Sequence, residues 1–324
     1  MKAFWIKSAN GGTALESRDI PEPEAKQGEI IVRMRAASLN RGELLAAIGH
    51  HSAAAARPAG GDGAGEVHAV GEGVAGFRPG DRVMFRARGT FAQYAAVLAE
   101  QAVPTPERLT WEQAASVPTV FVTAHESIRQ FGKLKKGNWL LVAGASSGVG
   151  VACIQAAKYL GAKVIGTSGS AAKLEKLRAI GLDVGIEARG GDFAAQVLKA
   201  TRGRGAKVAV NLVGGTAFPG CLHALANQGR LAIVGYVDGV MMSEIDLEAV
   251  HGKRLQIFGV SNAHLTPSQR ARATRSFARE LLPGFADGGI TPLVDRVFPF
   301  DELPAAKAYV DSNAQIGKVV VRMS

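Results

Sequence analysis

One segment, residues 142–150 (Val-Ala-Gly-Ala-Ser-Ser-Gly-Val-Gly), constrains the fold more than any other. It follows an apolar run at residues 138–143, typical of a buried strand, and leads into a helix-like segment at 149–160. Phosphate groups bind at helix N-termini, where backbone N–H groups are unpaired and small residues allow close approach. Ala145 and Ser147 replace the first two glycines of the strict dinucleotide fingerprint. In this strand–turn–helix context we interpret the segment as a dinucleotide-binding loop; an ordinary tight turn is the alternative.

Strand-like and helix-like segments alternate from about residue 121 onward. Gly161 and Gly181 stand where two helices are expected to end. The expected strands are residues 138–143, 163–166, 208–211, 230–234 and 255–260, and the expected helices include 149–160 and 171–180. This rhythm predicts a doubly wound parallel sheet over residues 121–291.

The first 120 residues have a different pattern, in which short apolar runs alternate with glycine and proline. Residues 79–81 (Pro-Gly-Asp) form a turn signal between two such runs. The expected strands are residues 30–32, 65–67, 82–85 and 94–97. We predict an all-β, barrel-like domain. A last strand, residues 317–321, is expected to return to it, so that residues from about 292 to 324 complete the domain.

The end of the second expected strand indicates which dinucleotide binds. Sites for NAD place Asp or Glu there to bond the ribose 2′-OH. Here residues 166–170 read Gly-Thr-Ser-Gly-Ser, without an acid, and Lys173 follows. Hydroxyl groups and a lysine accept a 2′-phosphate, which an acid would repel. The sequence therefore favours NADPH, although Ser170 could equally be a simple helix cap.

The net charge of +10 at pH 7 favours anionic ligands, but the basic residues are spread along the chain. One local cluster, Arg270, Arg272, Arg275 and Arg279, lies in an expected helix that begins with a capping box at residues 266–269. We interpret it as a solvated helix face rather than an RNA-binding surface, and expect no nucleic-acid partner.

Cysteine usage and hydropathy suggest a cytoplasmic protein. Cys153 and Cys221 lie in expected helices without CxxC spacing, so we expect buried thiols rather than a disulfide or structural zinc. No apolar run reaches the roughly 18 residues of a membrane span, and the first residues lack a secretory pattern. We expect no membrane association.

These features together resemble the medium-chain dehydrogenase/reductase superfamily, and specifically its zinc-independent quinone oxidoreductase branch. Besides the glycine-rich turn, the segments that carry the resemblance are residues 36–43, 61–67, 70–83, 114–118, 123–124 and 213–215. The resemblance implies an α/β protein with a GroES-like catalytic β-barrel domain, residues 1–120, and a Rossmann domain, residues 121–291. It also implies a homodimer joined through the Rossmann sheet, with the active site in the interdomain cleft.

Zinc-bearing members of the superfamily place Cys, His and Cys at positions that match Asn40, Asp62 and Thr119. An amide and a hydroxyl are poor zinc ligands, and one carboxylate cannot hold the ion alone. No metal is expected. Asp62 could be a polar cleft wall, but we favour a structural carboxylate that accepts backbone N–H groups.

Without a Lewis acid, alcohol oxidation has no means of stabilising an alkoxide, whereas hydride donation to an electron-poor acceptor remains feasible. We therefore expect a reductase that uses NADPH to reduce a small-molecule electron acceptor, a quinone or an enone. Reduction of an enoyl thioester is a close alternative. A crystallin-like or RNA-binding protein that holds NADPH without turnover is a rival of another class.

The resemblance assigns roles to individual residues. Asn40 is expected beside the nicotinamide and the acceptor, where its amide donates to a substrate oxygen. His51 stands where relatives carry an active-site tyrosine and is the second candidate catalytic residue, as a proton donor; a solvated loop residue is the alternative. Residues 52–57 are expected to be a loop. Arg189 could add charge near the adenine side. The other expected cofactor contacts are Thr123, Ser146, Ser147, Gly148, Val149, Gly150, Ser168, Gly169, Lys173, Asn211, Gly235, Tyr236, Val260, Ser261 and Lys318.

Overall fold

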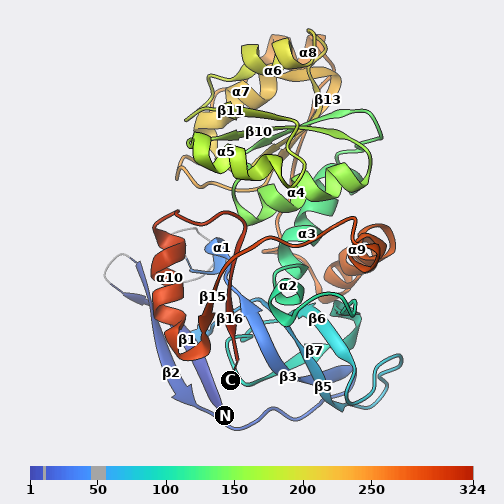
Figure 1. Ribbon diagram of the computed structural model, residues 1–324, viewed down its shortest axis with the longest axis vertical. Coiled ribbons are helices and arrows are strands. Elements are labelled where there is room, and N and C mark those ends of the chain that lie inside the picture. Colours follow the sequence, from blue (N-terminus) through green and yellow to red (C-terminus); the bar gives the residue numbers. More distant parts are fainter. Residues whose placement is uncertain (10–11, 45–55, 324) are drawn as a thin grey trace. The chain divides into compact units, whose positions relative to one another are not determined.

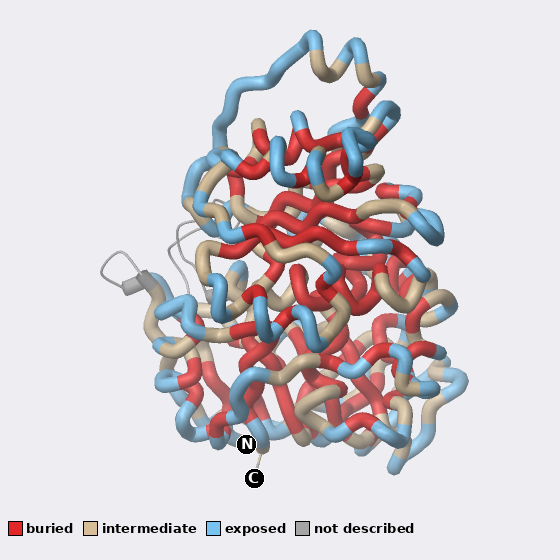
Figure 2. Tube along the Cα trace, turned by 45° about the horizontal axis from the view of Figure 1, so that its top comes forward, coloured by how far each residue is buried: buried red, intermediate tan, exposed pale blue. Residues whose placement is uncertain are grey.

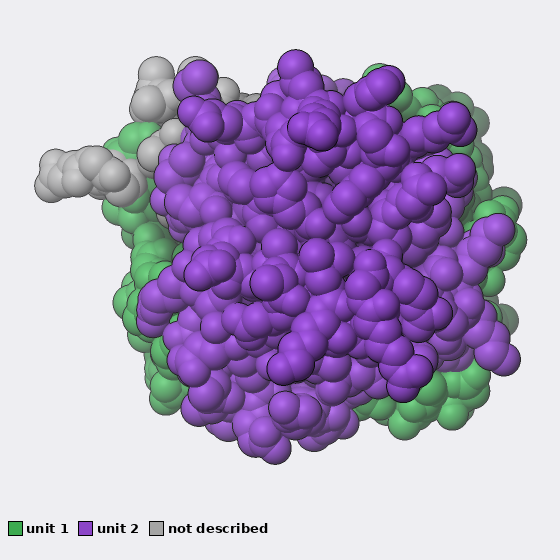
Figure 3. Space-filling view, turned by 90° about the horizontal axis from the view of Figure 1, so that it is seen from above, with its two compact units in different colours: residues 1–119, 265–324 green, residues 120–264 purple. Residues whose placement is uncertain are grey.

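The structure is a computed structural model that describes residues 1–9, 12–44 and 56–323. The chain forms two compact units, coloured separately in Figure 3. Unit 1 contains residues 1–119 and 265–324, and unit 2 contains residues 120–264. The boundary between them falls inside one helix, α3 (Pro118–His125).

Unit 1 is built on two β-sheets (Figure 1). The larger sheet has the order β15-β16-β3-β5-β6-β8, with β7 also paired to β3; the smaller has the order β2-β1-β4. Their strands are β1 (Lys2–Ala9), β2 (Gly12–Asp19), β3 (Glu29–Ser38), β4 (Arg57–Pro58), β5 (Asp62–Val70), β6 (Arg82–Arg86), β7 (Tyr94–Leu98), β8 (Ala102–Pro104), β15 (Val294–Pro299) and β16 (Lys318–Arg322). Since β16 pairs with β3, the predicted return of the last strand to the first domain is confirmed.

Unit 1 also contains helices. They are α1 (Arg41–Leu44), η1 (Ala99–Gln101), α2 (Trp111–Ala115), α9 (Pro267–Asp287), η4 (Phe300–Glu302) and α10 (Leu303–Asp311). The predicted capping box is present at the start of α9, where Thr266 Oγ1 accepts from Gln269 N.

Helix α9 groups with unit 1, whereas the sequence analysis placed residues up to 291 in the second domain. Contacts of α9 with β8 and η1 account for the difference. Unit 2 thus ends at residue 264, and the domain limits expected from the sequence stay a prediction.

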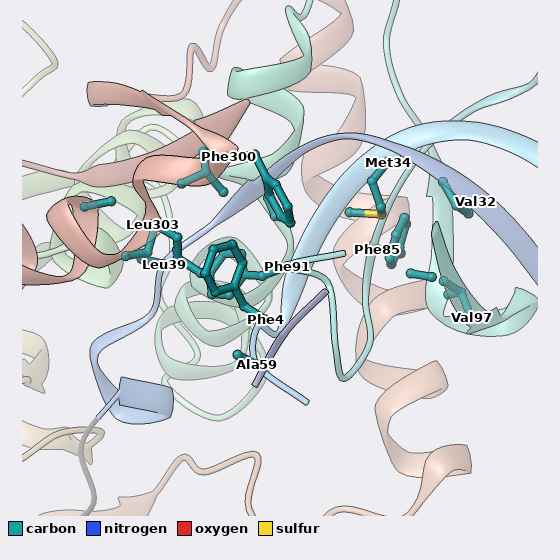
Figure 4. Packing of buried hydrophobic residues seen from close by; sticks show 14 of the residues in the cluster. Phe4, Val32, Met34, Leu39, Ala59, Phe85, Phe91, Val97, Phe300 and Leu303 are labelled. Carbon is teal, nitrogen blue, oxygen red and sulfur yellow. The ribbon is translucent and has the colours of Figure 1, made fainter. Parts of the chain in front are cut away.

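The core of unit 1 lies against β3 and gathers side chains from both ends of the chain. In β3 nearly every residue from Ile30 to Ser38 is buried, because this strand is covered on both faces. The rings of Phe4 and Phe300 pack edge to face with centroids 5.1 Å apart (Figure 4). The aromatic side chains from β1 and η4 thus tie the N-terminal strand to the C-terminal segment.

Unit 2 is a six-stranded parallel sheet with the order β11-β10-β9-β12-β13-β14 (Figure 1). Its strands are β9 (Trp139–Ala143), β10 (Lys163–Ser168), β11 (Val184–Glu187), β12 (Ala206–Asn211), β13 (Leu225–Ile233) and β14 (Gln256–Gly259). Helices α4 (Gly148–Tyr159) and α5 (Ala171–Arg178) cover one face, and α6 (Ala194–Ala200), α7 (Phe218–His223) and α8 (Leu247–Gly252) cover the other. This is the doubly wound fold expected from the sequence.

The central strands of unit 2, β9 and β12, are buried along most of their length (Figure 2). Residues 140–143 of β9 and 208–210 of β12 have no solvent exposure, as the continuous apolar runs predict for a sheet covered on both faces. Cys153 on α4 and Cys221 on α7 are free, buried thiols, as expected. Burial raises the pKa of Cys221 to about 12, so this thiol is inert. In the described part of the chain, no helix has the length and apolar character needed to cross a membrane.

Candidate functional site

The glycine-rich turn connects β9 to α4 at the carboxyl end of the sheet. Gly144 has a φ of +85°, which turns the chain sharply out of β9. Ser147 is the N-cap of α4: its Oγ accepts from Gly150 N at 3.1 Å and donates to Gly144 O at 2.9 Å. These bonds hold the turn and orient the first turn of α4, whose macrodipole favours an anion at this end.

Two glycines make the turn compact. A Cβ on Gly150 would lie 2.6 Å from the carbonyl oxygens of Gly144 and Ala145, so only glycine fits there. A Cβ on Gly166 of β10 would lie 2.7 Å from the Cβ of Ala145. Gly166 therefore makes room for Ala145. This compensates for the departure of the sequence from the strict fingerprint at that position.

The turn lies where the winding of the sheet reverses. Strands β9 and β12 are neighbours, but the chain continues from β9 to β10 on one side and from β12 to β13 on the other. Ligands of doubly wound sheets bind in the crevice at such a reversal, at the carboxyl ends of the strands. The glycine-rich turn and the N-terminus of α4 thus lie at the point where the strand order reverses. A dinucleotide diphosphate is a suitable ligand for this position.

Residues 168–173, at the end of β10, form the second expected contact region of the dinucleotide. Ser170 caps α5, with its Oγ accepting from Lys173 N at 3.4 Å. Arg189 lies over this turn: its Nη2 donates to Gly169 O at 3.3 Å, and a Cβ on Gly169 would lie 3.0 Å from Arg189 Cγ. A guanidinium thus lies at the end of β10, in the place where a NAD site has an acid.

Asn211, another expected contact, has its side chain occupied within its own turn. Its Nδ2 donates to Gly214 O at 2.8 Å, and its Oδ1 accepts from Val213 N and Gly214 N, each at 3.0 Å. The asparagine therefore shapes the loop that follows β12. Any contact with a cofactor would have to come from the loop backbone or from new bonds.

The remaining expected contacts of unit 2 lie near the same edge of the sheet. Thr123 is buried, and its Oγ1 accepts from Asn262 Nδ2 at 3.4 Å. Gly235 and Tyr236 follow β13, and Val260 and Ser261 follow β14 directly. Because the strands are parallel, these residues share the carboxyl edge with the glycine-rich turn.

A buried polar network occupies the sheet of unit 1, where the ends of three neighbouring strands meet. Asp62 begins β5 and pairs in register with Ser38, the last residue of β3. Asp62 Oδ1 accepts from Thr119 N at 3.1 Å and from Thr119 Oγ1 at 2.5 Å. The expectation that Asp62 is a structural carboxylate that accepts a backbone N–H is confirmed.

Asn40 and Lys318 complete the centre of this network. The Lys318 ammonium donates to Asn40 Oδ1 at 2.6 Å and to Leu39 O at 2.7 Å, and lies 3.6 Å from Asp62 Oδ2. Burial lowers the pKa of Lys318, while the negative charges of Asp62 and Glu43 oppose that shift. The two predicted residues Asn40 and Lys318 are thus brought together, although 278 positions separate them in the chain.

Glu43 is a further member of the network, and the sequence analysis did not assign it a role. It lies on α1, and its Oε1 accepts from Asn40 Nδ2 at 2.9 Å. Its Oε2 is buried without a hydrogen-bond partner among the described residues. Burial, followed by the negative charge of Asp62, raises the pKa of Glu43 to about 7. A carboxyl group poised near neutrality can exchange a proton under ordinary conditions.

The donor set does not suit zinc. Asp62 already accepts four hydrogen bonds, Asn40 contributes an amide, and an ammonium group lies within 4 Å of the carboxylate. Among the described residues, no group of three or more His, Cys, Asp or Glu side chains could hold a metal ion. The other candidate catalytic residue, His51, and residues 52–55 lie outside the described part of the chain.

Two family models match the chain. An alcohol dehydrogenase GroES-like domain matches residues 26–107, and a zinc-binding dehydrogenase model matches residues 148–279. The chain also matches polyketide synthase subunits, including a phenolphthiocerol/phthiocerol synthase subunit from Mycobacterium tuberculosis, but it spans only 14% of that protein's length.

Relatives of the chain's own length are also similar. A zinc-type alcohol dehydrogenase-like protein of Schizosaccharomyces pombe is 30% identical, and the match covers 95% of this chain and 94% of that protein. The structure of mycobacterial Rv1454c in complex with NADPH has a TM-score of 0.88 at 27% identity, covering 99% of this chain and all of the other. The CurK enoyl reductase has a TM-score of 0.86 at 26% identity, covering 99% of each chain. Together with the doubly wound sheet and the GroES-like unit, these matches establish that the chain belongs to the medium-chain dehydrogenase/reductase superfamily of oxidoreductases.

Proposed function

We propose that this oxidoreductase binds NADPH and uses it, without zinc, to reduce a quinone or another α,β-unsaturated carbonyl compound. The observation that carries the proposal is the turn between β9 and α4. There Ser147 caps the helix, and Gly150 occupies a position that a Cβ would obstruct. A dinucleotide diphosphate is the ligand for which such a turn is suited.

The choice of NADPH rests on the end of β10. Ser168 and Gly169 stand where a NAD site has an acid, and Arg189 folds over them. A guanidinium offers a phosphate charge and paired N–H donors. Lys173, in the first turn of α5, adds a second cation on the same turn. The NADPH complex of the mycobacterial relative supports this choice.

We propose a zinc-free enzyme because the side chains of the unit 1 network are unsuited to bind a zinc ion. Lys318 provides a fixed positive charge beside Asp62, and a divalent cation at the same place would meet an ammonium group. Quinones and enones suit such a site, because they accept hydride without Lewis-acid activation. When bound, the reduced nicotinamide supplies the hydride. Residues of this chain bind the dinucleotide, hold the acceptor and move the accompanying proton.

Reduction of an enoyl thioester is the second candidate. The matches to polyketide synthase subunits and to the CurK enoyl reductase favour it. An enoyl thioester is itself an α,β-unsaturated carbonyl compound, so the same hydride chemistry applies. What separates the two candidates is the size and polarity of the group beyond the carbonyl.

We also propose the domain limits expected from the sequence, 1–120 with about 292–324 and 121–291. We further propose a homodimer joined through β14. This strand ends the sheet of unit 2 and pairs only with β13 among the described strands. A sheet edge of this kind presents unpaired backbone groups to a second copy. Two apolar side chains are exposed on β14 and on α8, the helix that precedes it in the chain: Ile257 and Leu247. Light scattering of Leu247→Lys and Ile257→Lys tests the homodimer, because both charges should yield monomers if the copies meet there.

A spectrophotometric panel tests the acceptor class. Oxidation of NADPH and of NADH is followed with quinones, enones and enoyl thioesters, with and without added zinc. The expected result is turnover with NADPH that zinc leaves unchanged. Absence of turnover with every acceptor, combined with RNA binding that falls steeply with salt, would instead favour the binding-protein rival.

Two variants test the 2′-phosphate contacts. Arg189→Gln and Lys173→Glu are each expected to weaken NADPH at least tenfold while leaving NADH within about twofold. Lys176→Gln, on the exposed part of α5, is the matched control and should change neither affinity. Equal losses for both dinucleotides would contradict the assignment of these residues to the 2′-phosphate.

A further inference from the structure

We propose that Glu43 is the catalytic acid of this enzyme, which delivers a proton from its Oε2 to the acceptor as the hydride is transferred. The inference rests on the proposed function and deepens it. It assigns the proton to a residue that the sequence analysis did not single out, in place of His51, the proton donor expected from the sequence.

The hydrogen bonds of Asn40 exclude it as a donor to substrate in this arrangement. An amide has two N–H hydrogens, and Asn40 Nδ2 gives them to Glu43 Oε1 and Asp62 Oδ2, both at 2.9 Å. Its Oδ1 accepts from the Lys318 ammonium at 2.6 Å. Asn40 is therefore a positioning residue that fixes the orientation of the Glu43 carboxyl group.

Glu43 Oε2 is the free polar atom of the network. The oxygens of Asp62, the amide of Asn40 and the ammonium of Lys318 all have partners, whereas Glu43 Oε2 has none among the described residues and is buried. A buried polar atom without a partner costs about 1–3 kcal/mol. That cost is relieved if a substrate oxygen accepts the Oε2 proton.

The backbone around Glu43 is shaped to admit its carboxyl group. A Cβ on Gly61 would lie 2.6 Å from Glu43 Cδ and would overlap Oε1, so the glycine provides the space in which the carboxyl group lies. Arg57 Nη2 donates to the Glu43 carbonyl oxygen at 2.9 Å and holds the end of α1. The placement of the group is thus fixed from both its backbone and its side chain.

The charges that face Glu43 keep its proton exchangeable. Burial and the negative charge of Asp62 on β5 favour the protonated form. The Asn40 hydrogen bond and the positive charges of Lys318 on β16 and Arg86 on β6 favour the carboxylate; Arg57 on β4 also interacts with Glu43. The balance raises the pKa of Glu43 to about 7, where a general acid serves best near neutral pH.

The reaction balances without a further reactant. When bound, the reduced nicotinamide would supply the hydride and become oxidised, and an acceptor that gains this hydride at carbon or oxygen would carry the electron pair as an enolate or hydroquinone anion. The O–H bond at Glu43 Oε2 then breaks, and its proton binds that anion. The Glu43 carboxylate regains a proton from water before the next turnover.

The first test compares the pH profiles of kcat for the wild type and Glu43→Gln. Wild-type kcat should fall above about pH 7, tenfold for each further pH unit, as Glu43 loses its proton. Glu43→Gln should have a kcat at least 100-fold lower at pH 6 and no decline through this range. The dissociation constant for NADPH should stay within twofold. Glu66→Gln is the control: it changes a different carboxylate of unit 1, on strand β5, and should retain the wild-type profile.

A second test needs no cofactor. Infrared difference spectra of the wild-type protein should contain a carboxylic acid band that disappears with a midpoint near pH 7, and Glu43→Gln should lack it. Glu43→Asp keeps a carboxyl group, so its kcat should still fall at high pH. This variant replaces Glu43→Gln in the test if the Glu43→Gln protein does not fold. A limb that persists in the folded Glu43→Gln protein, or a wild-type spectrum without the band, overturns the inference. If none of the tested acceptors supports NADPH oxidation by the wild type, the proposed function is overturned. The step assigned to Glu43 is then overturned as well, even if the infrared band titrates.

Discussion

The Lys318 ammonium lies 3.6 Å from Asp62 Oδ2, and the two side chains are 6% and 0% exposed. Lys318 begins β16, Asp62 begins β5, and both strands lie beside β3, since the sheet order is β16-β3-β5. Desolvating two charges is costly, and the pair persists because the Lys318 ammonium and both carboxylate oxygens of Asp62 also form hydrogen bonds. The buried Asp62 carboxylate thus has a cation of the chain itself as its partner.

Lys318→Met should therefore destabilise the protein by about 3–5 kcal/mol, because it removes the positive charge that is paired with the buried Asp62 carboxylate. The measurement is urea-induced unfolding of the cofactor-free protein at pH 7.5. The double variant Lys318→Met/Asp62→Asn should lose less than the sum of the two single losses, since the partners are coupled. A single-variant loss below about 1 kcal/mol would mean that water or another group already neutralises Asp62.

Sequence patterns predicted those parts of the fold that depend on local chemistry. The turn after β9, the alternation of strands and helices, and the capping box of α9 follow from neighbouring residues, and the structure contains all three. The compensation between Ala145 and Gly166 is a contact between the turn after β9 and strand β10, which no local pattern contains.

The polar network could be predicted only in part, because its members come from distant segments. Asn40 and Lys318 were expected beside a cofactor, but their mutual bond joins residues 278 positions apart. The role of Glu43 depends on its burial beside Asp62. The sequence of α1, a helix of four residues, does not predict this burial. One signal was available: Gly61, directly before Asp62, is small where the carboxyl group of Glu43 must fit.

Gly61→Ala should displace the Glu43 carboxyl group and lower both stability and turnover. The new Cβ would lie 2.6 Å from Glu43 Cδ, and the network leaves that side chain little freedom to move. We expect a loss of about 1–3 kcal/mol, typical of overpacking, and a fall in kcat of at least tenfold. Gly42→Ala is the matched control on α1, because a Cβ there meets no atom of the described residues within 4 Å. Thermal unfolding and steady-state kinetics of the two variants provide the comparison, and equal behaviour would exclude the steric argument.

The stability of the protein should depend on pH through Glu43. Its pKa is about 7 in the folded state, above the ordinary 4.5, so the folded protein binds a proton that the unfolded chain has released. The stabilisation is complete below about pH 4.5 and is lost as the pH rises through 7; it is on the order of 2–3 kcal/mol. Urea unfolding at pH 5 and pH 8 should therefore show a larger decrease in the free energy of unfolding for the wild type than for Glu43→Gln. Equal decreases would mean that other groups carry the pH dependence.

Ser147→Ala should weaken both the helix and the cofactor site in unit 2. The hydroxyl caps α4 through Gly150 N and closes the turn through Gly144 O, so its loss should cost about 1 kcal/mol. The turn also positions the N–H groups proposed to bind the diphosphate, and the affinity for NADPH should fall about tenfold. Thr110→Ala removes the equivalent cap of α2 in unit 1, where Thr110 Oγ1 accepts from Gln113 N. It should cost similar stability but leave the affinity unchanged. Calorimetric titration with NADPH distinguishes the two variants, and a loss of affinity in both would indicate that the effect comes from general destabilisation.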